Sequence, residues 1–187
     1  MKSFALKAAL GLAPGLLLLA GSAKAQDGRA PDGMVCTNAM LNGDYAFTVS
    51  GQLFIPIGPG TFQSVQRQGV AMTHFDGFGN LSQVDLVLSD PSAPPPPGAP
   101  PTDKLTGFHT DEKGTYTVNP DCTGTFTINN PELTNPQTGK MTSGAIIVVK
   151  FVLSDHGRAI HTVVTALTPP GAPGPVPALI RSEGHRL

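Results

Sequence analysis

The sequence predicts an all-β chain folded as an antiparallel up-and-down barrel of about eight strands, with a β-sandwich as the alternative. Short segments with apolar side chains at every second position recur along the chain, separated by turns rich in Gly, Asp, Asn and Pro. No stretch after residue 25 has a convincing helical period. Closure into a barrel would also remove the free sheet edges that promote aggregation.

The clearest strand pair runs from Leu105 to Asn129. Asn119-Pro120-Asp121 has the composition of a tight turn, because proline presets φ and the flanking side chains can bond their own backbone. On either side, apolar residues alternate with threonines: Tyr116, Val118, Phe126 and Ile128. The segment is therefore predicted to be a hairpin.

Further strands are predicted on the same grounds at 41–51, 62–68, 69–75, 81–89, 144–154 and 158–167, with turns at 76–80 and 155–157. In the 81–89 strand, Val84, Leu86 and Leu88 share one face and Gln83, Asp85 and Val87 the other. The 144–154 strand is apolar on both faces, so we expect it to be central with its second face covered. The proline-punctuated segment 52–60 fits an edge strand or a wide loop.

The ends of the chain predict its domain organisation. Residues 1–25 have a lysine-containing start, an apolar run and an Ala23-Lys24-Ala25 cleavage site, which together indicate a signal peptide. A flexible lead-in at 26–35 then precedes a single barrel domain at 36–167. The Pro-rich stretch 91–101 is predicted to be an extended loop within that domain, and 168–187 a disordered Pro/Gly-rich tail.

Export determines the interpretation of the two cysteines. In an oxidising compartment, Cys36 and Cys122 are predicted to form a disulfide that ties the N-terminal segment to the central hairpin. The localisation predicted for the chain is periplasmic or extracellular, with no membrane insertion after signal cleavage.

Charge and motifs exclude several functions. The chain has 13 acidic and 12 basic residues, and three of the lysines lie in the leader, so the remainder is acidic and does not favour nucleic acid. The sequence has no Gly-x-Ser-x-Gly, no His-Glu-x-x-His and no phosphate-binding glycine loop. We therefore expect no cofactor, and the oligomeric state stays open.

Three phrases resemble a group of small exported bacterial proteins with an allene oxide cyclase-like, calycin-type barrel. They are Gly43-Asp44-Tyr45-Ala46-Phe47, then Phe75-Asp76-Gly77-Phe78-Gly79-Asn80, then Gly114-Thr115-Tyr116-Thr117-Val118 with Asp121-Cys122-Thr123-Gly124-Thr125. The resemblance extends from about Cys36 to Leu167 and concerns strands and turns. It implies a barrel with a small apolar interior able to hold a ligand, and the plant cyclase's catalytic residues have no counterparts in this chain.

Two His-x-Asp pairs, His74 with Asp76 and His109 with Asp111, could each offer two metal ligands from one face of a strand. In both pairs the aspartate borders a turn, so a structural role is favoured and no metal site is predicted. Lys150 and His161 lie on neighbouring predicted strands and could be polar anchors in a cavity. The simpler interpretation is an outward-pointing lysine and a hydrogen-bonded histidine.

Three hypotheses for function follow. The first is an exported binding module for a small apolar molecule, with the barrel interior lined by Tyr45, Phe47, Val49, Tyr116, Val118 and Phe126. The second is a structural or surface-associated protein whose barrel is filled. The third, favoured least, is a cyclase-like or isomerase-like enzyme using Lys150, His74 or His161, and we predict no specific catalytic residue.

Overall fold

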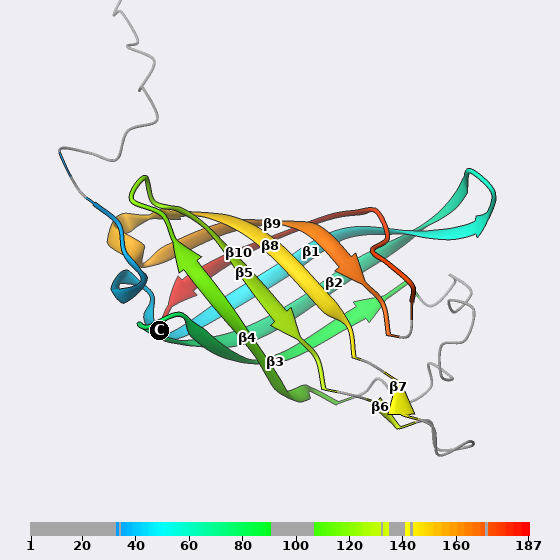
Figure 1. The fold of residues 1–187 in the computed structure, drawn as a ribbon, viewed down its shortest axis with the longest axis horizontal. Helices are drawn as coiled ribbons and strands as arrows, with labels where there is room; N and C mark the ends of the chain where they lie inside the picture. Colours follow the sequence, from blue (N-terminus) through cyan, green and yellow to red (C-terminus); the bar gives the residue numbers. More distant parts are fainter. Residues whose placement is uncertain are drawn as a thin grey trace, which may run out of the picture.

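The computed structural model describes residues 33, 35–90, 107–131, 133–134, 141–142, 144–170 and 172–187. Within these residues, eight antiparallel strands close into a barrel in the order β1-β10-β9-β8-β5-β4-β3-β2 (Figure 1). The strands are β1 (Asn42–Gly58), β2 (Thr61–Asp76), β3 (Asn80–Ser89), β4 (His109–Val118), β5 (Thr123–Asn129), β8 (Ile146–Ser154), β9 (Ala159–Thr168) and β10 (Ala178–Arg186). The predicted up-and-down barrel is therefore confirmed, and the sandwich alternative is wrong.

Small elements complete the fold. β6 (Leu133–Thr134) and β7 (Met141–Thr142) form a separate two-stranded sheet. Two 3-10 turns, η2 (Asn38–Met40) and η4 (Asp155–Gly157), precede β1 and join β8 to β9. Residues 1–32 and 91–106 lie outside the described residues, and with them the predicted signal peptide, most of the lead-in and the Pro-rich loop.

The predicted turn at 76–80 is confirmed by its hydrogen bonds. The Asp76 carboxylate accepts a bond from the Asn80 side chain and bonds from the backbone N–H groups of Phe78, Gly79 and Asn80, at 2.7–2.9 Å. Because these donors stabilise the charged form, they hold the pKa of Asp76 at about 2, with the Asn80 side chain the largest contributor. Gly77 and Gly79 adopt positive φ there, as the turn requires.

The prediction of a disordered tail from residue 168 to 187 is wrong. Strand β10 pairs with β1 along Tyr45 to Leu53 and with β9 along Ala159 to Val163, and so closes the barrel. The Pro/Gly-rich composition is confined to the connection before it. In β10 itself the inward positions include Gly184, where an added Cβ would lie 2.3 Å from the Phe47 ring. The sequence pattern of β10 is weak because glycine stands at inward position 184, where the Phe47 ring of the neighbouring strand leaves no room for a side chain.

Two other expectations need adjustment. β8 lies between β5 and β9, but the prediction that its second face is covered is wrong for the described residues, with Ile146 42 % and Val152 48 % exposed. In a closed barrel one face of each strand lines the interior and the other faces solvent. Segment 52–60 is the end of strand β1 and the turn that follows it. The β1–β2 hairpin continues past Leu53, the last β1 residue paired with β10 (Figure 1). Pro56, which has no N–H to donate, therefore lies where β1 has no β10 partner.

One end of the barrel interior is filled by aromatic rings. Phe75 packs edge-on against Tyr45 and Tyr116 with ring centroids 5.4 and 5.1 Å apart, and Phe126 contacts both Phe75 and Phe151. A smaller cluster of Leu53, Ile55 and Val65 forms a second apolar group.

The N-terminal segment covers this aromatic end. The Tyr116 hydroxyl donates to the carbonyl of Leu41 at 2.8 Å, and the Cys36 N–H donates to the carbonyl of Pro120 at 3.1 Å. The predicted disulfide between Cys36 and Cys122 is confirmed, with Cα atoms 5.0 Å apart. The segment is thus fastened to the turn between β4 and β5.

Candidate functional site

On the inward faces of β3 and β4, part of the barrel interior is lined by polar side chains instead of apolar ones. Gln83 and Asp85 follow buried Leu81 at alternate positions of β3, so all three point inward. Glu112 projects from the neighbouring strand and is completely buried. The outward face of β3 carries the apolar Val84, Leu86 and Leu88 instead, of which Leu88 is 51 % exposed.

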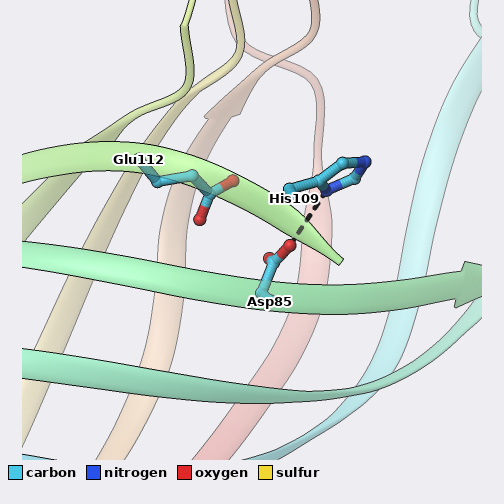
Figure 2. A group of neighbouring side chains, drawn as sticks. All are labelled: Asp85, His109 and Glu112. Atoms are coloured by element: carbon cyan, nitrogen blue, oxygen red, sulfur yellow. Dashed lines mark hydrogen bonds and ion pairs between the residues drawn. The ribbon is translucent and has the colours of Figure 1, made fainter. Parts of the chain in front are cut away.

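A bulge at the start of β4 brings a histidine to these carboxylates. Gln83 pairs with Glu112 and Asp85 pairs with His109. Between these two pairs β4 advances by three residues and β3 by two, so β4 contains one extra residue. Asp111, inside the bulge, has the left-handed φ of 68°. The extra residue places His109 beside Asp85, and the pairing between the two strands ends there. Figure 2 shows Asp85, His109 and Glu112 converging from the two strands.

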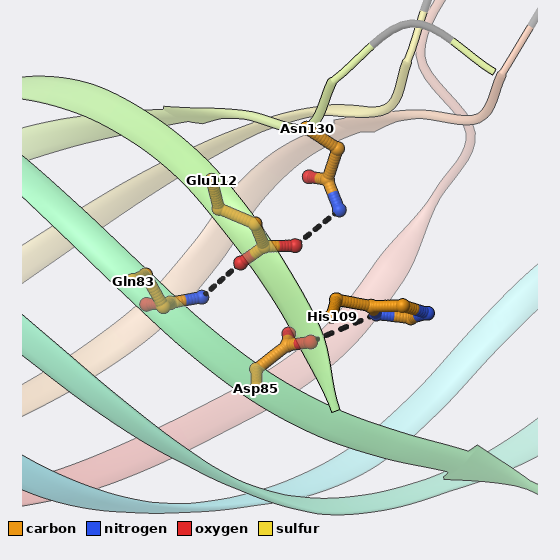
Figure 3. A network of polar contacts seen from close by, with 5 residues as sticks. All are labelled: Gln83, Asp85, His109, Glu112 and Asn130. Carbon is orange, nitrogen blue, oxygen red and sulfur yellow. Dashed lines mark hydrogen bonds and ion pairs between the residues drawn. The ribbon is translucent and has the colours of Figure 1, made fainter. Parts of the chain in front are cut away.

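Two separate sets of hydrogen bonds fix the orientation of these groups (Figure 3). His109 Nδ1 lies 2.9 Å from Asp85 Oδ1. Gln83 Nε2 donates to Glu112 Oε2 at 2.9 Å, and the Asn130 amide donates to Glu112 Oε1. Thr73 in turn donates to Gln83 Oε1 at 2.8 Å, which leaves the amide nitrogen of Gln83 directed at Glu112.

Burial perturbs both carboxyl groups. It is the main cause that raises the pKa of Glu112 to about 7, and the nearby charge of Asp85 raises it further. Burial also raises the pKa of Asp85, against the opposing effect of the His109 hydrogen bond. In the described part of the chain, no Lys or Arg forms an ion pair with either carboxylate. Among the described residues, His109 is therefore the one cationic partner that forms an ion pair at the site.

The cluster has the dimensions of an ion site. One ligand atom from each of Asp85, His109 and Glu112 lies within 4.8 Å of the other two. Asn130 Oδ1 is buried without a hydrogen-bond partner among the described residues, although the nitrogen of the same amide bonds Glu112. His109 forms the accessible side of the cluster, with 41 % of its side chain exposed.

Five of the six residues predicted to line a ligand cavity lie in the core cluster at the aromatic end. Val49 is half-buried, and the other five are buried and contribute to the core: Tyr45, Phe47, Tyr116, Val118 and Phe126. The rings of Tyr45, Tyr116 and Phe126 each contact the ring of Phe75. Their role in binding an apolar molecule stays a prediction.

The two His-x-Asp pairs do not come together as pairs. His74 Nδ1 lies 2.8 Å from Asp44 Oδ1 on the outer wall of the barrel. The Asp76 carboxylate instead accepts hydrogen bonds within the turn at 76–80. His109 bonds Asp85, because the bulge separates its direction from that of Asp111.

Lys150 and His161 lie on the outer wall of the barrel. The Lys150 ammonium donates to Thr125 Oγ1 at 2.7 Å, and His161 Nε2 lies 3.1 Å from the Ser154 hydroxyl. They border an open groove of about 440 Å³ over β5, β8 and β9. The outward-pointing, hydrogen-bonded interpretation is therefore confirmed for both.

Comparison with known proteins adds no assignment: no family model, no curated protein and no solved structure matches the chain. None of the helical segments that the structure describes could span a bilayer.

Proposed function

We propose that the protein is a small-ligand-binding barrel whose site is the Asp85–His109–Glu112 cluster, and that this site receives the positive charge of its ligand. The observation that carries the proposal is a pair of buried carboxylates without a Lys or Arg partner in the described part of the chain. Burying a carboxylate is unfavourable unless a cation or hydrogen bonds compensate for the lost hydration. A bound cation would supply that compensation for both groups at once.

We also propose that the protein acts outside the cytoplasm. The Cys36–Cys122 disulfide is consistent with an oxidising compartment. The composition of residues 1–25 supports export through a cleaved signal peptide. Nothing in the proposed role requires nucleic acid, in accord with the acidic balance of the chain after its leader.

A purely structural barrel is the second candidate, and the packing of the aromatic end favours it. The rings of Tyr45, Phe75 and Tyr116 stand in contact, so an apolar ligand at that end would have to separate them. The polar cluster lies elsewhere in the interior, where binding leaves this packing intact. An enzyme using Lys150, His74 or His161 gains no support, because all three side chains are exposed and take part in surface hydrogen bonds.

Native mass spectrometry of the oxidised, tag-free protein, purified without chelators, tests the proposal. We expect an added mass that is lost on denaturation and is absent from the Asp85→Asn, Glu112→Gln double variant. Asp44→Asn is the matched control, because Asp44 bonds a histidine in the same way on the outer wall. A bare chain under all conditions, with no cation taken up when offered, would leave the structural barrel as the better account.

A further inference from the structure

We infer that the ligand at this site is a divalent first-row transition-metal ion, bound by carboxylate oxygens of Asp85 and Glu112 and by an imidazole nitrogen of His109. The inference rests on the proposed function and specifies its ligand. Three features of the site carry it: the space between the ligand atoms, their chemistry, and the groups that surround them.

The available space suits a single atom. Tetrahedral metal bonds of about 2.0–2.2 Å place neighbouring ligand atoms roughly 3.3–3.6 Å apart. The three ligand atoms lie within 4.8 Å of one another. Glu112 has no exposed surface, and Asp85 is only 6 % exposed. An organic ammonium group would need room for its carbon substituents between these buried side chains. A bare ion needs only small movements of side-chain ends.

The mixture of donor atoms selects the class of metal. Ca²⁺ prefers six to eight oxygen ligands, and Mg²⁺ keeps several waters and avoids imidazole. A site with one imidazole and two carboxylates instead suits Mn²⁺, Fe²⁺ or Zn²⁺. The donors come from two strands. Asp85 lies on β3, and His109 and Glu112 lie on β4 on either side of the bulge.

The surrounding groups are those that metal carboxylates use as supports. Gln83 holds one oxygen of Glu112, and Asn130 holds the other. Such hydrogen bonds orient a ligand and are part of most metal sites. Asn130 Oδ1, buried and without a hydrogen-bond partner among the described residues, is a further acceptor atom beside the three ligands.

Isothermal titration calorimetry on the oxidised, tag-free mature chain tests the inference, with Zn²⁺, Mn²⁺, Ca²⁺ and methylammonium as separate probes. We expect one Zn²⁺ or Mn²⁺ per chain, bound more tightly than Ca²⁺. Glu112→Gln and His109→Ala should each weaken this binding at least about tenfold, the loss that removing even a supporting residue causes. His74→Ala is the control, because His74 is a comparably exposed histidine paired with an aspartate.

His109→Ala keeps the test decisive if Glu112→Gln fails to fold, because His109 is the most exposed member of the cluster. Circular dichroism checks the fold of each variant. Equal Zn²⁺ affinity in wild type and His109→Ala would overturn the inference. If methylammonium binds and the metals do not, the metal assignment is wrong and the proposed cation site stands. If no probe binds, both fail.

Discussion

Removal of the Cys36–Cys122 disulfide should destabilise the barrel by several kcal/mol. The bond closes a loop with a sequence separation of 86 residues. A crosslink over that length removes about 15 cal/mol/K of entropy from the unfolded chain, which corresponds to about 4.6 kcal/mol at 25 °C. This value is an upper limit for a model in which the bond acts on the unfolded state alone. It is comparable with half of the total stability of a typical domain.

Guanidinium unfolding of the Cys36→Ala, Cys122→Ala double variant measures the effect. Alanine is chosen because Cys36 is 2 % exposed, and a serine hydroxyl there would be buried. We expect a lower midpoint, with the free energy of unfolding reduced by about 3–4.5 kcal/mol. Reduced wild type, studied in parallel, should behave like the variant. A reduction below about 1 kcal/mol would refute the claim that this bond secures the N-terminal segment to the barrel.

Three further predictions concern stability. Asp76 contributes stability that is fully present above its unfolded pKa near 3.8 and is lost as the pH falls through its folded pKa of about 2. In thermal melts, Asp76→Asn should therefore unfold more easily than wild type at pH 7, and the difference should shrink near pH 2. Tyr116→Phe removes the donor to the Leu41 carbonyl and should cost about 1–3 kcal/mol in guanidinium unfolding; an unchanged midpoint would contradict the proposed anchoring. Gly184→Ala places a methyl group against the Phe47 ring and should destabilise by about 1–3 kcal/mol, whereas a neutral result would mean that β10 does not pack as described.

Most strand positions and turns could be predicted from the sequence because they depend on neighbouring residues. The prediction of separate strands at 62–68 and 69–75 is wrong, because both segments belong to the single strand β2. The hairpin turn at 119–121 and the turn that Asp76 caps both follow from local backbone chemistry. β10 was beyond such reasoning. Its inward residues are mostly small or polar, and Gly184 makes sense only beside the Phe47 ring of a strand far away in the chain.

The candidate site was hidden for a related reason. Alternation in β3 separates Gln83 and Asp85 from the apolar Val84 and Leu86, but a period of two does not say which face is inside. The usual assumption would bury the apolar face, and the barrel buries the polar one. The approach of His109 to Glu112 further depends on a bulge that only the pairing of β3 with β4 reveals.

Paramagnetic broadening of backbone amide NMR signals by Mn²⁺ tests the central claim most directly, because it locates the bound ion. At substoichiometric Mn²⁺, signals from Gln83, Asp85, Glu112 and Asn130 should broaden first. Signals from Ser154 to Arg158, at the opposite end of β8 from Asn130, should stay sharp. Broadening centred on the Asp44–His74 pair, or uniform loss of signal across the chain, would contradict the account.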